Sequence, residues 1–444
     1  MNKGTLAFIH PKMSKTSIAA ATAGVFLEYY DYMLYMHLLV ILSPLFFPSA
    51  NIALTTFLGF ATFALATFIQ PLGGILFGHL GDRIGRRKAM ASSIALTTLS
   101  TFSIGLLPTY AQIGVAASIL LILCRALQSL SIGGEVPGAS SYLIENSTKE
   151  NRCLRSSYIV TACTIPGILA AFLGYFFTRE SFPEWGWRVP FLTTLIFGAL
   201  GFYIRYRLQE SYAFTKVVEK KEILKVPLLE VLKKDKIAIL CTLGICATIE
   251  APFSFLYVYL PHMINNSLQI PPHQIFAMNM LVMAFTAVCV VLMGKIGDKI
   301  GVRKMMIGGS IVFSVIIYPL FSLITVSQGI WTILMVEIII SFVWSIAAAP
   351  LNVVTGLMYP TQRRYSGNAF SWGLGSILFV GFSPLISQGL VLLTGSPTSP
   401  ALFLSVCGIA GVIGVLYAPD ISGEQDNPLQ TLLKLKLSPQ KQNS

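Results

Sequence analysis

The stretch GHLGDRIGRRK at residues 78–88 occurs a second time, as GKIGDKIGVRK at residues 294–304. The two copies share glycines, an aspartate and an isoleucine at the same spacing and lie 216 residues apart in a chain of 444. Glycines permit tight turns and a close approach of helices. A basic cluster that happened to occur twice would not need this matched pattern, so the repeat predicts a chain built from two related halves.

Apolar blocks fill most of the sequence between these loops. Hydrophobic residues make up 54% of the chain and charged residues only 11%, whereas soluble domains carry about a quarter charged residues. Each block of about 17–30 residues can cross roughly 30 Å of hydrocarbon as a helix. The sequence therefore predicts an all-α membrane protein with twelve transmembrane helices in two pseudo-symmetric six-helix bundles. The blocks begin near Ile18, Ala53, Ala89, Ile113, Tyr158, Val189, Ile237, Ile275, Met305, Trp331, Gly367 and Pro400.

The placement of the cations explains the formal net charge of +12. Of the 31 Lys and Arg residues, 28 fall in the two tails or in every second gap between apolar blocks, which is the positive-inside distribution of membrane proteins. Only Arg125, Arg179 and Arg188 lie elsewhere. We therefore expect both termini to face the cytoplasm, and we attribute the basicity to membrane topology rather than to nucleic-acid binding.

The longest hydrophilic gap lies at the middle of the chain and predicts the domain borders. The expected order is a cytoplasmic N-terminal tail at 1–17, an N-terminal six-helix bundle at 18–206, a cytoplasmic central loop at 207–236, a C-terminal six-helix bundle at 237–418 and a cytoplasmic C-terminal tail at 419–444. The seven cysteines show no metal-binding spacing. We expect no metal and no other cofactor.

The residues at 78–88 resemble the loop signature of the major facilitator superfamily, G-x-L-G-D-R-x-G-R-R-K, and the second copy matches it slightly less well. Other stretches resemble its metabolite:proton symporter family, which includes proline/betaine, α-ketoglutarate, citrate and shikimate transporters. These are FLEYYDY at 26–32, IQPLGG at 69–74, RALQ at 125–128, GGE at 133–135, WGWRVPF at 185–191 and YPTQRRYSG at 359–367. The resemblance extends from Ala20 to about Leu416.

This resemblance implies the major facilitator fold and secondary active transport by alternating access. The implied protein is a multi-pass protein of the bacterial inner membrane, works as a monomer and is not an enzyme. Its implied partners are a small-molecule substrate, a proton and the lipid bilayer, with no nucleic acid. The two signature loops are implied to gate the cytoplasmic side, through Gly78, Gly81, Asp82, Arg83, Gly85, Arg86, Arg87, Gly294, Asp298, Lys299, Gly301 and Arg303.

Charged side chains inside the apolar blocks are the main functional candidates, because a charge in hydrocarbon costs several kcal/mol and is rarely kept without use. These residues are Glu28 and Asp31 in the first block, Arg125 and Glu135 in the fourth, Glu250 in the seventh and Glu337 in the tenth. The resemblance implies that these four helices line the central cavity. Helical spacing places Tyr32 and Tyr35 near Asp31, Gln128 near Arg125, Tyr257 near Glu250 and Trp344 near Glu337.

Asp31, Glu28 and Glu135 are the proton-coupling candidates, because a carboxyl in a low-dielectric cavity binds a proton more readily. Protonation would release Arg125 from an ion pair and let it receive a substrate carboxylate, which couples the two events. The substrate-binding candidates are Arg125, Gln128, Tyr32, Tyr35, Glu250, Tyr257, Glu337 and Trp344. Structural roles compete with this reading: a buried ion pair for Glu28, Asp31 and Arg125, a brace between helices for Glu135, and local packing for Glu250 and Glu337.

Five intramembrane acids against one base favour a zwitterion, such as proline, betaine or an amino acid, as the substrate of a proton-coupled symporter. The alternative is a symporter for a di- or tricarboxylate such as α-ketoglutarate or citrate, which would want more arginine. The second alternative is a drug:proton antiporter of the same fold, although IPGILA at 165–170 differs from the G-P-x-x-G-G pattern of such exporters. A membrane enzyme is disfavoured, because the sequence has no histidine cluster, nucleotide loop or nucleophile–base spacing.

Overall fold

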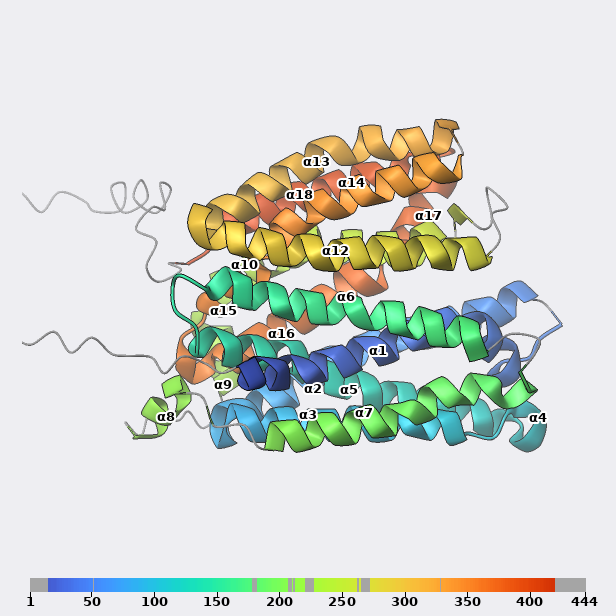
Figure 1. Cartoon of the computed structure of the whole chain (residues 1–444), viewed down its shortest axis with the longest axis horizontal. Coiled ribbons are helices and arrows are strands. Elements are labelled where there is room, and N and C mark those ends of the chain that lie inside the picture. Colours follow the sequence, from blue (N-terminus) through green and yellow to red (C-terminus); the bar gives the residue numbers. More distant parts are fainter. Residues whose placement is uncertain are drawn as a thin grey trace, which may run out of the picture.

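The computed structural model describes residues 15–50, 52–177, 182–206, 210, 212–219, 227–261, 263–264, 272–327 and 329–419. Within these ranges every regular element is a helix, and the long helices run alongside one another in one bundle (Figure 1). Nearly all of the two expected tails, and Arg179, lie outside the described residues.

The first group of helices is called the N half. It consists of α1 (Lys15–Phe46), α2 (Ile52–Ile84), α3 (Arg86–Leu106), α4 (Tyr110–Ile113), α5 (Val115–Glu145), α6 (Arg152–Phe177), η1 (Glu184–Trp187) and α7 (Arg188–Tyr206). Two short helices follow in the expected central loop, α8 (Tyr212–Glu219) and α9 (Pro227–Lys234).

The remaining helices form the C half. They are α10 (Lys236–Ser254), η2 (Phe255–Tyr259), α12 (Pro272–Ile300), α13 (Val302–Ser327), α14 (Ile330–Ala348), α15 (Leu351–Leu357), η3 (Thr361–Arg363), α16 (Arg364–Ser376), η4 (Ile377–Gly381), α17 (Ser383–Thr394) and α18 (Ser399–Tyr417). Helix α10 continues directly into η2, which is one π-helical turn.

In the described part of the chain, ten helices are long and apolar enough to cross a membrane. Helices α1 and α2, with 32 and 33 residues, are not among these ten, so the count of twelve stays a prediction. Each expected block except the fifth begins within three residues of the start of an observed helix. That helix begins at Arg152 rather than near Tyr158, because a polar first turn precedes its apolar part.

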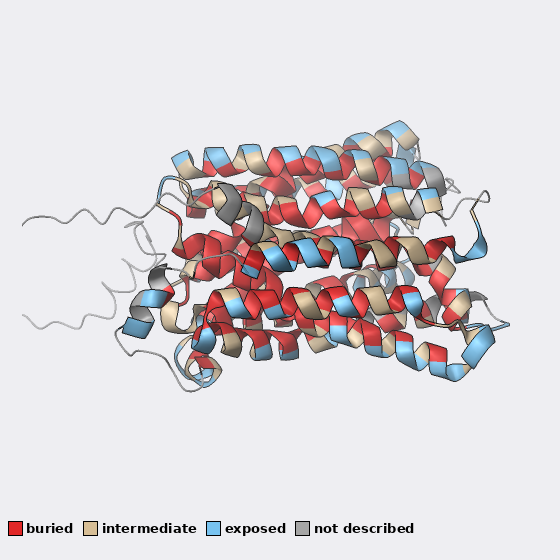
Figure 2. Cartoon of the chain, turned by 60° about the horizontal axis from the view of Figure 1, so that its bottom comes forward, coloured by how far each residue is buried: buried red, intermediate tan, exposed pale blue. Residues whose placement is uncertain are grey.

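Polar and apolar side chains are distributed as in a protein that lipid surrounds. Large apolar side chains cover the outer surface, and Ile196, Val326 and Leu393 expose 71%, 82% and 86% of their area. Charged side chains such as Glu28, Asp31 and Arg125 are buried instead, and the buried residues lie toward the centre of the bundle (Figure 2). This arrangement suits helices whose backbone polar groups are satisfied internally within hydrocarbon.

Two helix pairs make the most extensive contacts between the two halves. Helix α6 of the N half runs along α12 of the C half, as Figure 1 shows, and α2 packs against α16. Small residues allow the close contacts. A Cβ at Gly74 would approach the backbone of Ala369 to 2.8 Å, and a Cβ at Gly78 would approach that of Ser366 to the same distance.

Both signature loops lie at one end of the bundle, which we call the motif end. Gly85 separates α2 from α3 with φ 106°, and Gly301 separates α12 from α13 with φ 101°. Side chains with a Cβ rarely adopt this backbone conformation. The glycines of the repeat therefore make the same tight turn in each half.

Candidate functional site

A chain of polar side chains connects Asp31 to Arg125 inside the N half. The Thr101 hydroxyl on α3 hydrogen-bonds the Asp31 carboxylate on α1. Gln128 donates to Thr101 Oγ1 at 2.6 Å and accepts from Arg125 at 2.8 Å. The Arg125 guanidinium also lies 4.1 Å from the centre of the Tyr35 ring, a cation–π geometry. Asp31 and Arg125 are thus coupled through two neutral side chains, and both are 1–2% exposed.

Glu135 is held differently, in an ion pair with Arg205 at the end of α7. Ser93 on α3 donates to the same carboxylate, and Arg205 donates to the backbone oxygens of Met90 at 3.0 Å and Ala21 at 2.7 Å. The group therefore ties α1, α3, α5 and α7 together. Helical spacing groups Glu135 with Arg125 on one face of α5, whereas the structure directs Glu135 to a base of its own.

Glu28 lies between these two groups on α1. It is 2% exposed, and its Oε2 has no hydrogen-bond partner among the described residues. Its charge interacts with the Glu135–Arg205 pair, with Asp31 and with Glu250 of the C half. The charge state of Glu28 therefore depends on the charges of all three.

A small cavity between the halves collects aromatic side chains around Glu250. Its volume is about 20 Å³, which is room for about one water molecule. Tyr29 packs edge-on against Phe253 with ring centres 6.1 Å apart, and Phe253 lies 6.3 Å from Trp344. We call it the inter-half cavity; its lining is Tyr29, Val136, Ile159, Val160, Cys163, Ile249, Glu250, Phe253, Trp344, Leu351, Asn352 and Trp372.

The inter-half cavity contains only part of the residue set that the sequence suggests. Glu250 and Trp344 line it together, whereas Glu28, Asp31, Arg125 and Glu135 are not part of its described lining. Spacing alone also groups Tyr257 with Glu250. In the structure Tyr257 lies within the π-helical turn η2, and the wider turn gives its side chain a different direction from that in an α-helix. The Tyr257 hydroxyl lies 3.3 Å from Thr286 of α12.

Glu337 and Tyr32 are not part of the described lining of this cavity. Glu337 is 2% exposed, its Oε2 has no hydrogen-bond partner among the described residues, and its charge interacts with Tyr257. The Tyr32 ring lies 6.1 Å from Tyr29, and its hydroxyl interacts electrostatically with both Glu250 and Arg125. Tyr32 therefore interacts both with Arg125 of the polar chain and with Tyr29 and Glu250, which line the inter-half cavity.

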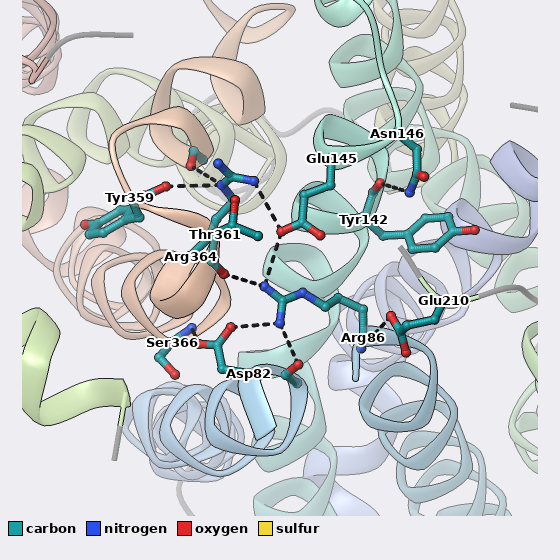
Figure 3. Close-up of polar contacts among 12 residues, drawn as sticks. Asp82, Arg86, Tyr142, Glu145, Asn146, Glu210, Tyr359, Thr361, Arg364 and Ser366 are labelled. Atoms are coloured by element: carbon teal, nitrogen blue, oxygen red, sulfur yellow. Dashed lines mark hydrogen bonds and ion pairs between the residues drawn. The ribbon is translucent and has the colours of Figure 1, made fainter. Parts of the chain in front are cut away.

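Arg86 is the centre of a buried charge cluster at the motif end (Figure 3). Its guanidinium lies 3.0 Å from Asp82 and 3.2 Å from Glu145 and donates to the Thr361 carbonyl at 2.8 Å. Arg364 of the C half also pairs with Glu145, at 3.2 Å. These contacts cross from one half to the other, so the motif end is closed in this structure.

Each signature aspartate caps a helix of the opposite half. Asp82 accepts from the backbone N–H of Ser366, in the first turn of α16, at 2.9 Å. Asp298 accepts from the N–H groups of Cys153 and Leu154, in the first turn of α6, at 2.8 and 3.1 Å. A carboxylate at a helix N-terminus satisfies free N–H groups and interacts favourably with the helix dipole. The two copies therefore form equivalent contacts.

The other residues of the two loops do not all bridge the halves. Arg83 is exposed and contacts His79 of its own helix, and Lys299 is exposed. Arg87 lies over the Tyr206 ring, and Arg303 donates to the carbonyls of Val415 and Ala418. Gly81 packs against the Tyr365 ring, and Gly294 packs against Ser157 of the other half. Arg303 thus stays within the C half.

Several residues that sequence reasoning did not single out complete these groups. Arg205 reads as the first cation of the central loop, and Thr101 and Ser93 read as ordinary hydroxyl residues of an apolar block. Glu210, from the loop after α7, accepts from the backbone N–H groups of Arg86 and Arg87 at 3.0 and 3.3 Å. The only signal for Glu145 and Arg364 was their place next to a block end or inside a matched stretch.

Two family models match consecutive parts of the chain. One, described as sugar (and other) transporter, matches residues 16–251, and the other, described as Major Facilitator Superfamily, matches residues 249–439. The chain belongs to the major facilitator superfamily. This confirms the resemblance of the two signature loops, and it makes the chain a transporter of small molecules rather than an enzyme.

Relatives of this superfamily member include named bacterial transporters. A proline/betaine transporter of Salmonella typhimurium is 32% identical over 427 residues, covering 92% of this chain and 84% of the relative. A putative proline/betaine transporter of Staphylococcus aureus is 30% identical over 447 residues, covering 96% and 95%. Together with the ten candidate membrane helices, these relatives identify the major facilitator chain as a multi-pass inner-membrane protein.

Solved structures agree on the fold. A proton:xylose symporter bound to 6-bromo-6-deoxy-D-glucose superimposes with a TM-score of 0.76 over 94% of this chain and 98% of the symporter, at 17% identity. The human organic anion transporter MFSD10 gives a TM-score of 0.67 over 90% and 99%, at 15% identity. At such identities the likeness establishes the major facilitator fold and leaves the substrate open.

Proposed function

We propose that the chain is a proton-coupled symporter that imports a small zwitterion such as proline or a betaine. The polar chain Asp31–Thr101–Gln128–Arg125 carries the proposal. It joins the helices α1, α3 and α5 deep in the N half, where a carboxyl and a guanidinium are both buried. Residues of this kind inside a membrane mark ion and substrate pathways.

Coupling follows from the charge of Asp31. When Asp31 is ionised, its charge attracts Arg125 through Thr101 and Gln128 and holds the guanidinium in place. A proton on Asp31 removes this attraction and leaves Arg125 available for a substrate carboxylate. By linkage, a bound carboxylate raises the proton affinity of Asp31 by the same factor, so proton and substrate bind together.

Alternating access supplies the direction of transport. We propose that the motif end faces the cytoplasm, as the positive-inside distribution favours, and that the expected tails, six-helix bundles and central loop have the borders given by the sequence. The Arg86 cluster and the two aspartate caps then close the inner side and open when the halves rock apart. Among the site candidates, Tyr32 and Tyr35 position Arg125, and Glu28 adjusts the field at Asp31.

The relatives support a zwitterion, since both are named for proline and betaine. Away from the motif end, the described part of the chain also offers a single buried arginine, Arg125, together with the buried acids Glu28, Asp31, Glu250 and Glu337. A di- or tricarboxylate would meet net repulsion from these acids. The dicarboxylate symporter therefore remains the weaker alternative, and a drug antiporter weaker still.

Reconstituted protein tests the proposal. Uptake of labelled proline and glycine betaine into liposomes is measured with an acidic outside, with and without a protonophore. Asp31→Asn, which imitates the protonated carboxyl, is expected to lower gradient-driven uptake by about tenfold or more, within the usual range of coupling between sites. Exchange of substrate at equal pH should continue, because it needs no net proton movement.

The matched control is Glu150→Gln, which removes an exposed carboxyl from a loop and should transport as the parent does. Undiminished gradient-driven uptake by Asp31→Asn would exclude Asp31 as the proton carrier. Uptake that a protonophore leaves unchanged in the parent protein would exclude proton coupling altogether.

A further inference from the structure

Glu250 is the buried acid whose surroundings best fit a positively charged ligand. It lies in α10, 14 residues after the start of the helix at Lys236, which is about 21 Å along the axis. This depth places it inside the bundle, in the wall between the two halves. It is 6% exposed and borders the inter-half cavity.

The Glu250 carboxyl has no partner of its own in the described part of the chain. It takes part in no hydrogen bond and no ion pair there, whereas Glu135 is paired with Arg205 and bonded by Ser93. A buried carboxylate without a partner is costly. A cation that arrives with the substrate would supply the missing charge.

Aromatic side chains from both halves line the cavity that this carboxyl borders. Tyr29 comes from the N half, and Phe253, Trp344 and Trp372 come from the C half. The Trp344 indole N–H donates to the Ile249 carbonyl at 3.0 Å, so this ring is fixed in position. Aromatic faces attract cations, and cages of such rings with an acid are a known way of binding quaternary ammonium groups.

We infer that Glu250 and these four aromatic side chains receive the substrate's nitrogen, and that they prefer a fully alkylated ammonium to a primary one; the inference rests on the proposed function. The reason is the supply of acceptors. A primary ammonium has three N–H donors, which need three acceptors once water is gone. Most side chains in the described lining of the inter-half cavity are apolar or aromatic, and Glu250 is the only carboxylate among them.

A trialkylated nitrogen needs no hydrogen bonds and loses none on entry. It gains the charge of Glu250 and contact with the rings, while Arg125, across Tyr32, is left for the carboxylate at the other pole. The cavity measures about 20 Å³, so substrate entry requires its two walls to move apart. Those walls belong to different halves, and the motion is therefore the one that alternating access provides.

Binding to purified protein tests this without requiring transport. The probes are glycine betaine and 3,3-dimethylbutanoate, which keeps the shape and the carboxylate but replaces the positively charged nitrogen by carbon. The parent protein should bind glycine betaine at least roughly tenfold more tightly than the carbon analogue by titration calorimetry. Glu250→Gln should reduce this ratio to about threefold or less, and the exposed control Glu184→Gln should leave it unchanged.

A second series needs no variant and so remains decisive if Glu250→Gln does not fold. Affinity of the parent protein should fall from glycine betaine through dimethylglycine and sarcosine to glycine, as each N–H donor is added. An unchanged ratio in a folded Glu250→Gln protein, or tighter binding of glycine than of glycine betaine, would overturn the inference and leave zwitterion symport intact. A parent protein that binds neither these zwitterions nor proline would instead refute the proposed function, and the inference with it.

Discussion

The two halves of the molecule treat their buried charges differently. In the N half two of the three buried intramembrane acids are connected to a base: Glu135 pairs with Arg205, and Asp31 is linked to Arg125 through two neutral side chains. The third, Glu28, has no ion pair in the described part of the chain, and its Oε2 has no hydrogen-bond partner there. In the described C half, Glu250 and Glu337 are buried with no ion pair. The N half thus places buried acids and bases together, whereas the buried acids Glu250 and Glu337 of the C half have no base paired with them among the described residues.

The same asymmetry appears in the two signature loops. Both aspartates cap a helix of the opposite half, but Arg86, which centres the charge cluster, has Val302 at the matching position of the second copy. The first loop therefore bridges the halves through charged side chains and a helix cap, whereas the described part of the second bridges them through its cap and the packing of Gly294 on Ser157. Both copies of the repeat keep the aspartate cap, but only the first copy adds Arg86, the centre of the buried charge cluster.

Breaking the Glu135–Arg205 ion pair of the N half should cause the largest loss of stability. Glu135→Gln leaves the buried Arg205 charge without its partner, and breaking such a pair costs about 3–5 kcal/mol. We expect a much lower melting temperature in detergent and a low yield of monodisperse protein. The double variant Glu135→Leu/Arg205→Met should recover most of the loss, because no charge then stays uncompensated.

This result separates the two roles of Glu135. A brace between helices predicts loss of stability and its recovery in the double variant. If Glu135→Gln instead melts like the parent protein and loses only gradient-driven uptake, Glu135 would be a proton carrier and the contrast between the halves would need revision.

Removing Arg86 from the charge cluster of the first loop should have the next largest effect. Arg86→Gln leaves Asp82 without its buried base and weakens the contact through Thr361, so we expect about 3 kcal/mol less stability for the closed motif end. Lys88 and Lys304 occupy matching positions of the two copies and are exposed. Spin labels there should show a longer distance in Arg86→Gln, while Arg83→Gln, which removes an exposed cation, should keep the parent distance.

Unchanged distances in Arg86→Gln would mean that packing of α2 on α16, rather than the charge cluster, keeps the motif end closed. The comparison between the loops would then be one of sequence only.

Much of the fold was predictable because hydropathy and the repeat are strong signals. The helix starts follow from apolar blocks, and glycines 85 and 301 adopt the positive φ angles that a tight turn demands. The intramembrane charges could also be located, since a charge in an apolar block is conspicuous. Which charges meet was not predictable, because that depends on where side chains of different helices point.

Arg205 and Tyr257 illustrate the two reasons. Arg205 is the penultimate residue of α7, where its long side chain can reach either the loop or the bundle; it reaches Glu135, and Gly24 on α1 leaves the space for both. Tyr257 lies within the π-helical turn η2, whose wider turn the 3.6-residue period does not anticipate. Tyr29 lies about 100° from Glu28 on the helix, outside the acidic stripe, yet it is the aromatic side chain that α1 contributes to the inter-half cavity.

The smallest expected effect tests the equivalence of the two caps. Asp298→Asn keeps an acceptor oxygen for only one of the two N–H groups, of Cys153 and Leu154, that donate to the separate carboxylate oxygens, and it loses the charge at the start of α6. A cap of this kind is worth about 1 kcal/mol. Asp82→Asn loses a cap and the ion pair with Arg86 together, so it should increase the distance between labels at Lys88 and Lys304 more.

The two caps act on separate helix pairs, and their effects on the closed state should add to within about 0.5 kcal/mol. Equal effects of the two variants would contradict the weaker bridging by the second loop, and a clear departure from additivity would mean that α6–α12 and α2–α16 open as one unit.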